Sequence, residues 1–177
     1  MRFTEAGLKG AWLVDLVSTF DDRGSFARTF CENEFHEHGL ETRFVQHSIS
    51  TSSRLHTLRG MHFQKVPHRE VKLVSCLQGA VWDVMVDLRT DSPTYGNWAA
   101  YELSPQNGRQ LYIPRGFAHG YLTLADDTVI SYLISEFYCA PAASGVRYDD
   151  PRLGITWPAE PAVISERDKD WPLLGSA

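Results

Sequence analysis

The 177-residue sequence contains only three cysteines, Cys31, Cys76 and Cys139, and no two of them have the spacing of a CxxC motif. An odd, widely spaced set argues against a disulfide framework, so we expect reduced, buried thiols in a cytoplasmic protein. The sequence also lacks a run of about 18 apolar residues, and therefore predicts no membrane span. Its first residues lack the apolar core of a signal peptide.

Positive charge is scarce as well. The 17 Lys and Arg residues are outnumbered by 22 Asp and Glu residues, which gives a net charge of −5. No Lys/Arg run is present to neutralise the phosphates of a nucleic acid, so we expect no nucleic-acid partner. A local basic pocket for one small anion remains compatible with this balance. Repeats and linkers are absent too, and 43% of the residues are apolar, which predicts a single domain over residues 1–177.

Short runs rich in Val, Ile, Leu, Tyr and Trp alternate with turn residues, a pattern typical of β-strands. One short helix is predicted at 32–38, with Gly39 as its C-terminal stop. The proline-rich tail, 151–177, is expected to wrap the strands as ordered loops and turns. Ten short strands in one domain favour an all-β sandwich or jelly-roll barrel. They are predicted at 11–17, 26–30, 43–50, 57–64, 71–76, 80–88, 97–103, 110–114, 119–124 and 128–138.

Counting every second residue assigns side chains to strand faces. In the last predicted strand, Tyr132 and Tyr138 share a face and are separated by about 20 Å along a regular strand. That is roughly the length of an elongated sugar nucleotide, although both side chains could equally be core aromatics. In an earlier strand, Asp83 and Asp87 fall on the face opposite Trp82, which predicts a polar strand face.

Two histidines lie in informative contexts. The segment 108–119 has the spacing Gly-x5-Pro-x-Gly-x2-His, which matches the second motif of the cupin barrels, where a Pro-x-Gly turn delivers a histidine into the barrel. The first cupin motif should offer His-x-His and a nearby Glu, but this chain has His62 with Gln64 in place of the second histidine, and a displaced Glu70. Because a metal generally needs three protein ligands, and only His62 and His119 are firm, no metal site is predicted.

A histidine without a metal can still act as a general base near pH 7, provided that a carboxylate holds its tautomer. Asp168 is a candidate carboxylate, but it follows Ser165 with the spacing of a capping box, which predicts a helix start instead. Lys72 lies among apolar residues. Its side chain either extends outward or points into a pocket to meet an anion, and both possibilities stay open.

Arg59 precedes His62 by three residues, so a regular strand would place the two side chains on opposite faces. Both could serve one site only if the strand bulges between them. Gly60 is the expected position of such a bulge.

Short motifs follow one another in a fixed order from about residue 22 to residue 172. They are Asp-Arg-Gly-Ser-Phe at 22–26, Leu-Arg-Gly-Met-His-Phe-Gln at 58–64, Lys-Leu-Val at 72–74, Asp-Val-Met-Val-Asp-Leu-Arg at 83–89, Ser-Pro-Thr at 92–94, Ile-Pro-Arg-Gly-Phe-Ala-His-Gly at 113–120, Asp-Asp-Pro at 149–151, Trp-Pro at 157–158 and Ser-Glu-Arg-Asp at 165–168. Each motif is weak alone. Together, in this order, they resemble the dTDP-4-dehydrorhamnose 3,5-epimerase family.

The resemblance implies a cupin-type jelly roll (a double-stranded β-helix) with short helical segments, which works as a homodimer without a metal or other cofactor. It implies that His62 is the general base, paired with Asp168, and that Tyr132 is the acid on the opposite face of the sugar. Lys72 would stabilise the enolate oxygen. Further contacts are implied for Arg59, His119 and Gln46 in the substrate pocket, Tyr138 on the nucleobase, and Arg23 and Phe26 at the neighbouring subunit's site.

Several substrate-contact positions depart from the family pattern. Arg28 stands where a Glu is usual, Ser48 where an Asn is usual, and Arg167 replaces a common Lys. The segment 138–146 lacks the usual Glu and is one residue longer after its first residue. We therefore expect the chemistry to be kept, while the nucleotide, the sugar or the number of inverted centres can differ.

The implied activity matches these residue types. A 4-keto sugar has acidified C–H bonds at C3 and C5, charge builds on O4 when a base removes the proton, and a proton returned from the other face inverts the centre. We predict an epimerase that inverts C3, C5 or both in a nucleotide-linked 4-keto-6-deoxyhexose, in deoxysugar or rhamnose-type biosynthesis. A sugar-nucleotide 3,4-ketoisomerase, a metal-dependent cupin oxygenase and a non-catalytic sugar-nucleotide-binding cupin are the alternatives.

Overall fold

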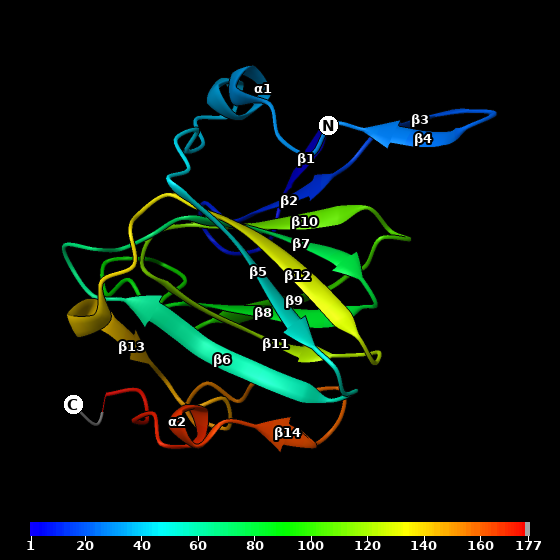
Figure 1. The fold of residues 1–177 in the computed structure, drawn as a ribbon. Coiled ribbons are helices and arrows are strands. Elements are labelled where there is room, and N and C mark those ends of the chain that lie inside the picture. Colours follow the sequence, from blue (N-terminus) through cyan, green and yellow to red (C-terminus); the bar gives the residue numbers. More distant parts are fainter. Residues whose placement is uncertain (176–177) are drawn as a thin grey trace.

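Two antiparallel sheets face one another in the computed structural model, which describes residues 1–175 (Figure 1). The first sheet has the strand order β1 (Arg2–Glu5), β2 (Trp12–Asp15), β10 (Arg109–Ile113), β7 (Lys72–Gln78), β12 (Thr128–Ile134) and β5 (Gln46–Ser52). The second has the order β13 (Ala143–Gly145), β6 (Thr57–Gln64), β11 (Phe117–Thr123), β8 (Val81–Asp87) and β9 (Trp98–Leu103). Apart from the pairs β1–β2 and β8–β9, neighbouring strands are not consecutive in sequence, as in a jelly roll, and the predicted fold class is confirmed.

The space between the sheets is filled by the inward side chains of both. Val74, Leu111 and Ile130 come from the first sheet, and Met85 and Phe117 come from the second. Alternate residues on these strands face inward, as the pleat of a β-strand requires. This inner cluster forms the apolar core between the two sheets.

Two further apolar clusters cover the outer faces. Phe35 of α1 (Glu32–Glu37) packs against the first sheet, near Tyr112 of β10. On the second sheet, Val86 of β8 packs in a cluster with Leu153 and Trp157 of the C-terminal segment. Strands β8 and β11 are therefore covered on both faces, so a carboxylate on either strand has no access to bulk water.

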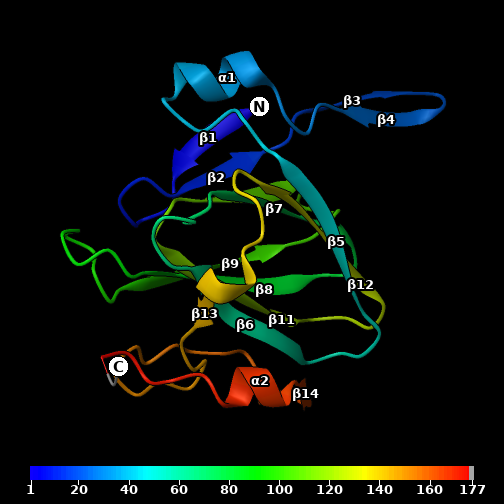
Figure 2. The ribbon, with the colours of Figure 1, turned by 60° about the vertical axis from the view of Figure 1, so that its left-hand side comes forward.

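The C-terminal segment contains a short strand that the sequence pattern did not predict. This strand, β14 (Val163–Ile164), pairs in parallel with β6, and the helix start predicted at Ser165 follows it as α2 (Glu166–Lys169) (Figure 2). The segment also covers the outer face of the second sheet through its apolar residues. No helix within residues 1–175 is long and apolar enough to cross a membrane.

The predicted last strand is too long. β12 ends at Ile134, so Tyr138 does not continue its inward face, and the expected alignment of Tyr132 and Tyr138 along one regular strand is wrong. The backbone turns away because its N–H groups find side-chain acceptors: Phe137 donates to Glu136 Oε1, and Tyr138 donates to Gln46 Oε1 at 2.7 Å. A short 3-10 helix, η1 (Ala140–Ala142), follows.

A two-stranded hairpin, β3 (Ser18–Asp21) and β4 (Gly24–Ala27), projects from the body of the molecule (Figures 1 and 2). The strand predicted at 26–30 is β4, displaced toward the N-terminus, and its partner β3 was not predicted. Phe20 and Phe26 are both exposed on this hairpin.

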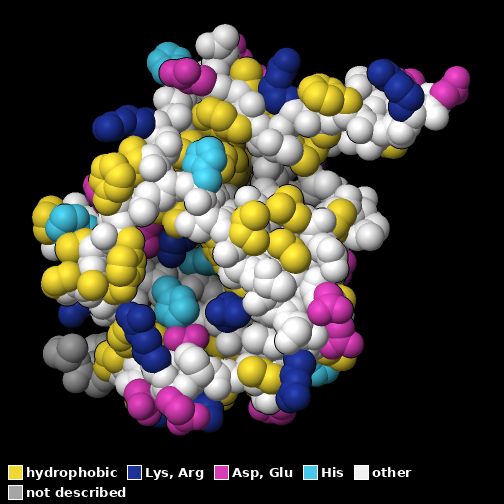
Figure 3. All heavy atoms as spheres, in the orientation of Figure 1, with side chains coloured by type: hydrophobic (Ala, Val, Ile, Leu, Met, Phe, Trp, Pro, Cys, Tyr) yellow, Lys and Arg dark blue, Asp and Glu magenta, His cyan; other side chains and the backbone are white. Residues whose placement is uncertain are grey.

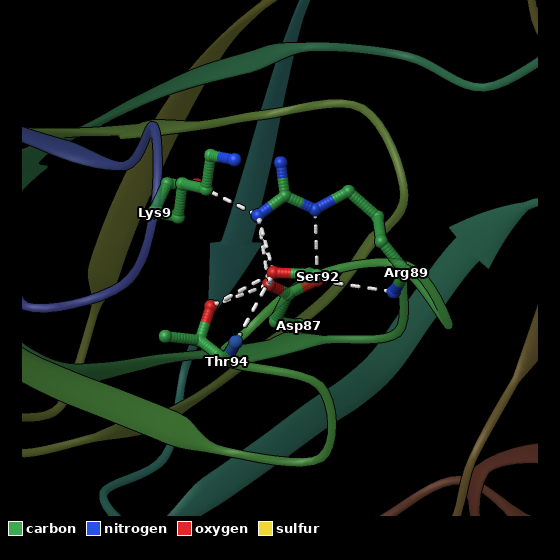
Figure 4. A network of polar contacts seen from close by, with 5 residues as sticks. All are labelled: Lys9, Asp87, Arg89, Ser92 and Thr94. Carbon is green, nitrogen blue, oxygen red and sulfur yellow. Dashed lines mark hydrogen bonds and ion pairs between the residues drawn. The ribbon is translucent and has the colours of Figure 1, made fainter.

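Asp83 and Asp87 share one face of β8 as predicted, but both are fully buried. The Asp87 carboxylate accepts hydrogen bonds from Arg89, Ser92 and Thr94, and Arg89 also donates to the Lys9 carbonyl (Figure 4). Burial works to raise the pKa of Asp87, but these hydrogen bonds, led by that of Arg89, outweigh it and lower the pKa to about 2. This network holds the loop after β8 in place.

Candidate active site

Two cavities meet at His62, which lines both of them together with Arg167. The first has a volume of about 200 Å³ and the second of about 370 Å³. Figure 3 shows a hollow on this side of the molecule in which histidine, Lys and Arg side chains gather. The predicted site residues in the first cavity are Gln46, His62, Lys72, Tyr138 and Arg167. Those in the second are Arg59, His62, Arg167 and Asp168.

His62 and Asp168 form a hydrogen-bonded pair, with 2.7 Å between Nε2 and Oδ1. An ionised carboxylate only accepts hydrogen bonds, so the neutral imidazole carries its proton on Nε2 and leaves the lone pair of Nδ1 free. The His62 side chain is 43% exposed, whereas that of Asp168 is 6% exposed. The histidine can therefore meet a ligand, while the carboxylate holds its tautomer from behind.

Asp168 accepts more than one hydrogen bond. Gly60 N donates to Oδ2 at 3.2 Å, and Trp171 Nε1 donates to Oδ1 at 3.3 Å. Burial works to raise the pKa of Asp168, but the hydrogen bonds that it accepts, His62 first among them, outweigh burial and lower the pKa below its ordinary value. The carboxylate therefore stays ionised and acts as an acceptor for His62.

Asp168 takes part in both the predicted helix cap and the pair with His62. Ser165 caps α2, and its side chain accepts a hydrogen bond from the backbone N–H of Asp168 at 3.1 Å. Trp171, which follows the helix, fits over Gly145, where an added Cβ would lie 2.5 Å from the indole ring. The cap and this close contact together fix the Asp168 carboxylate against β6.

Strand β6 bulges at the predicted position. His62 pairs with His119 and Arg59 pairs with Tyr121, so three steps along β6 match two steps along β11. Gly60 has a φ of +149°, and a Cβ there would lie 2.6 Å from the Gly120 Cα. Only glycine fits this contact, and the bulge lets Arg59 and His62 line the same cavity.

Lys72 points into the first cavity and not toward bulk solvent. It lies at the start of β7, its side chain is 13% exposed, and Nζ lies 3.1 Å from Glu70 Oε1. Nζ also donates to the His62 carbonyl oxygen at 3.3 Å. The cation is thus tied to the residue that carries the candidate base. Arg167 adds a second positive charge, stacked over Trp171 at 4.9 Å.

A second histidine–aspartate pair lies deeper in the barrel. His119 Nε2 is 3.0 Å from both carboxylate oxygens of Asp83, and the two side chains are 5% and 0% exposed. His119 does line the barrel interior, but it borders neither of the two cavities. Asp83 was predicted only as part of a polar strand face. Its partnership depends on β8 lying beside β11, which no local pattern in the sequence indicates.

Tyr132 lies on β12 of the first sheet, whereas His62 lies on β6 of the second. The Tyr132 hydroxyl is 3.2 Å from Ser50 Oγ, which is also 2.8 Å from the Tyr121 hydroxyl. Burial raises the pKa of Tyr132 well above its ordinary value, Tyr121 adds to the rise, and the hydrogen bond with Ser50 opposes it. Tyr132 therefore keeps its proton near neutral pH.

The remaining predicted contacts fall into two groups. Ser48 lies opposite Tyr132 in the register of β5 and β12, on the same face of the sheet, but borders neither cavity. The three predicted contacts on or beside the hairpin lie outside both cavities. Arg23 forms an exposed ion pair with Asp21, Phe26 is exposed, and Arg28 lies 3.4 Å from Glu34.

Within residues 1–175, no group of three His, Cys, Asp or Glu side chains could hold a metal ion. Gln64 stands at the position of the second cupin histidine, and its side-chain amide forms hydrogen bonds with backbone groups. Its amide nitrogen donates to the His68 carbonyl at 3.0 Å, and its amide oxygen accepts from Cys139 N.

The fold and the site together define a cupin-type jelly roll with a cavity lined by a lysine and by a histidine that pairs with an aspartate. The chain belongs to the dTDP-4-dehydrorhamnose 3,5-epimerase family, whose model matches residues 5–176, and it is therefore an isomerase. It is 44% identical over 176 residues to the dTDP-4-dehydrorhamnose 3,5-epimerase of Methanothermobacter thermautotrophicus, across 98% of this chain and 94% of the relative. It is 38% identical over 178 residues to a dTDP-4-dehydrorhamnose 3-epimerase of Streptomyces niveus, across 100% of this chain and 86% of the relative.

Solved structures of the same family have the same fold. The crystal structure of the Bacillus anthracis dTDP-4-dehydrorhamnose 3,5-epimerase, determined with TDP and PPi bound, superposes with a TM-score of 0.95 at 41% identity. The match covers 98% of this chain and 99% of that one.

Proposed function

We propose that the protein inverts C3, C5 or both in a dTDP-linked 4-keto-6-deoxyhexose by removing a proton from one face of the sugar and returning one to the other. The observation that carries this proposal is the His62–Asp168 pair, 2.7 Å apart, on the wall of a cavity that also contains Lys72. The relatives named above act, by their names, on dTDP-4-dehydrorhamnose.

His62 takes the proton from the carbon next to the C4 carbonyl, and the C–H electron pair moves into an enolate with its charge on O4. Lys72 stabilises that charge, since a cation beside a developing oxyanion lowers the barrier. Tyr132 then donates its proton to the opposite face of the same carbon. The assignment is supported by the position of His62 and Tyr132 on different sheets, and by the raised pKa that keeps Tyr132 protonated.

The nucleoside diphosphate extends from the sugar along the first cavity. Tyr138 and Gln46 line this cavity, and an exposed aromatic ring is suited to stacking on a nucleobase. Arg59 and Arg167 border the second cavity and can pair with phosphate oxygens, for which Arg has suitable bidentate geometry. His119 and Ser48 border neither cavity, so they support the pocket from behind its lining residues.

The active species is a homodimer in which the hairpin of each subunit reaches the site of the other. Arg23 and Phe26 lie on this hairpin, and Arg28 follows it. All three lie away from the cavities of their own chain, so they can meet a substrate only in a neighbouring subunit. Removing residues 18–27 should yield a monomer by analytical ultracentrifugation, with loss of activity.

The test is to incubate the protein with dTDP-4-keto-6-deoxyglucose in D₂O and follow the C3 and C5 protons by NMR. Exchange at both carbons with inversion supports a 3,5-epimerase, and exchange at one carbon supports a one-centre epimerase, as in the Streptomyces niveus relative. A product with a displaced carbonyl would indicate a ketoisomerase. Binding without exchange would overturn the proposal. The control is His62→Ala, which should abolish exchange.

A further inference from the structure

Glu70, in the loop between β6 and β7, is a buried carboxylate with only one of its two oxygens paired. Its side chain is 7% exposed and lines the first cavity. Oε1 lies 3.1 Å from Lys72 Nζ, but Oε2 is buried and has no hydrogen-bond partner among residues 1–175. A buried carboxylate oxygen without a donor carries a desolvation cost.

Stability does not account for this arrangement. A buried ion pair commonly contributes little, because desolvation of the two charges offsets their attraction, and a half-satisfied carboxylate makes the balance worse. Glu70 is held against Lys72 in spite of that cost. Such a position, on a cavity wall, points to a role in the chemistry of the cavity.

The geometry of Lys72 indicates what that role is. An ammonium group has three N–H donors. One is donated to the His62 carbonyl oxygen, and the ammonium also forms an ion pair with Glu70, whose Oε1 lies 3.1 Å from Nζ. These two contacts orient the ammonium and leave at least one N–H for a ligand in the cavity.

We infer that Glu70 is a positioning residue, which fixes the Lys72 ammonium and supplies its counter-charge so that one N–H remains for the substrate oxygen that gains charge. This inference rests on the proposed function. Glu70 lies two positions before Lys72, the first residue of β7, and the ion pair between them shows that their side chains meet.

The test compares Glu70→Gln with wild type. The glutamine keeps the size and one acceptor oxygen but removes the charge. We expect kcat to fall about tenfold with KM unchanged within twofold, since the ammonium acts on charge that develops after binding. In a Lys72→Met background the same substitution should cause no further loss, because Glu70 acts through Lys72.

Glu41→Gln is the matched control. Glu41 is also a partly buried carboxylate in an ion pair, 2.8 Å from Arg115 Nη2, but it borders neither cavity. The kcat of Glu41→Gln should stay within twofold of that of the wild type. The inference is overturned if Glu70→Gln keeps kcat within twofold, if its effect is confined to KM, or if its loss multiplies with that of Lys72→Met.

A second readout needs no turnover, so it separates this inference from the proposed function. NMR of the Lys72 ammonium should show slow hydrogen exchange in wild type and fast exchange in Glu70→Gln. Equal exchange in the two proteins contradicts the positioning role, even if the wild type is an active epimerase. If the wild type fails to turn over the sugar but the exchange rates differ as expected, the proposed function fails while the positioning of Lys72 stands.

Discussion

Two histidine–aspartate pairs lie side by side on the second sheet, and they differ in access. His62 and His119 are direct register partners on β6 and β11. The His62 side chain is open to two cavities, whereas His119 and its partner Asp83 are sealed in the barrel. The carboxylates also differ in origin, because Asp168 comes from the C-terminal segment and Asp83 from the adjacent strand.

The comparison shows that residue type alone does not define a catalytic group. Both pairs have short contacts between an imidazole nitrogen and a carboxylate, and both can hold a tautomer. Only the open pair can touch a carbon acid, so we assign proton removal to His62. The sealed pair joins β8 to β11, the strand that pairs with β6 at His62. Four substitutions test this division of roles.

The largest effect is expected for the carboxylate of the open pair. Asp168→Asn should lower kcat by about 10²-fold or more, because the asparagine amide can donate to Nε2 and favour the wrong tautomer of His62. Steady-state rates measure the loss, and circular dichroism confirms folding. A rate within threefold of wild type would show that Asp168 does not support the base.

The sealed pair should affect stability first. Asp83→Asn replaces a buried charge that pairs with His119, and breaking a buried pair costs about 3 kcal/mol or more. Urea denaturation should show a lower midpoint with an unchanged m-value. If stability is unchanged while turnover falls 10²-fold, the sealed pair takes part directly in the chemistry and the division fails.

Asp87 lies on the same strand as Asp83 but is bound to no histidine. Its effect on the free energy of unfolding should therefore vary with pH through its own carboxylate alone. Its pKa falls from the ordinary 3.8 to about 2 in the folded protein. A carboxylate with a lowered folded pKa stabilises the fold above its unfolded pKa, and this contribution is lost as the pH falls from about 4 to about 2. The shift corresponds to about 2 kcal/mol.

The difference in unfolding free energy between wild type and Asp87→Asn should therefore be largest above pH 4 and should shrink toward pH 2. Urea titrations at a series of pH values measure it. A difference that does not vary with pH would mean that Asp87 contributes through packing and neutral hydrogen bonds only.

The smallest effect is expected for Trp171→Phe. This change removes one hydrogen bond of 3.3 Å to Asp168, which keeps its contacts with His62 and Gly60. A single such bond contributes about 0.5–1.5 kcal/mol, so kcat should fall roughly two- to tenfold. A loss comparable to that of Asp168→Asn would show that the indole itself orients the carboxylate.

Features encoded locally could be predicted from the sequence. The helix predicted at 32–38 is α1, which ends at Glu37, and the predicted stop residue Gly39 has a φ of +67° just beyond the C-cap. The bulge at Gly60 followed from the need to bring Arg59 and His62 to one side of a strand. The cap at Ser165 was readable from four residues alone.

Features that depend on strand order could not be predicted. The partnership of Asp83 with His119 arises because β8 lies beside β11, and the periodicity of a strand does not name its neighbour. The end of β12 at Ile134 depends on Gln46, a residue 92 positions from Tyr138. The burial of Glu70 likewise results from the closure of the barrel around its loop.

The most direct test of the central claim is to compare deuterium incorporation at C3 and C5 of dTDP-4-keto-6-deoxyglucose in wild type, His62→Gln and His119→Gln. We predict that the exchange rate of His62→Gln falls by about 10²-fold or more, which is the rate enhancement expected from a positioned general base. His119→Gln should retain exchange within about tenfold once its rate is corrected for the folded fraction. Retained exchange in His62→Gln, with loss in His119→Gln, would contradict the assignment and place proton removal at the sealed pair.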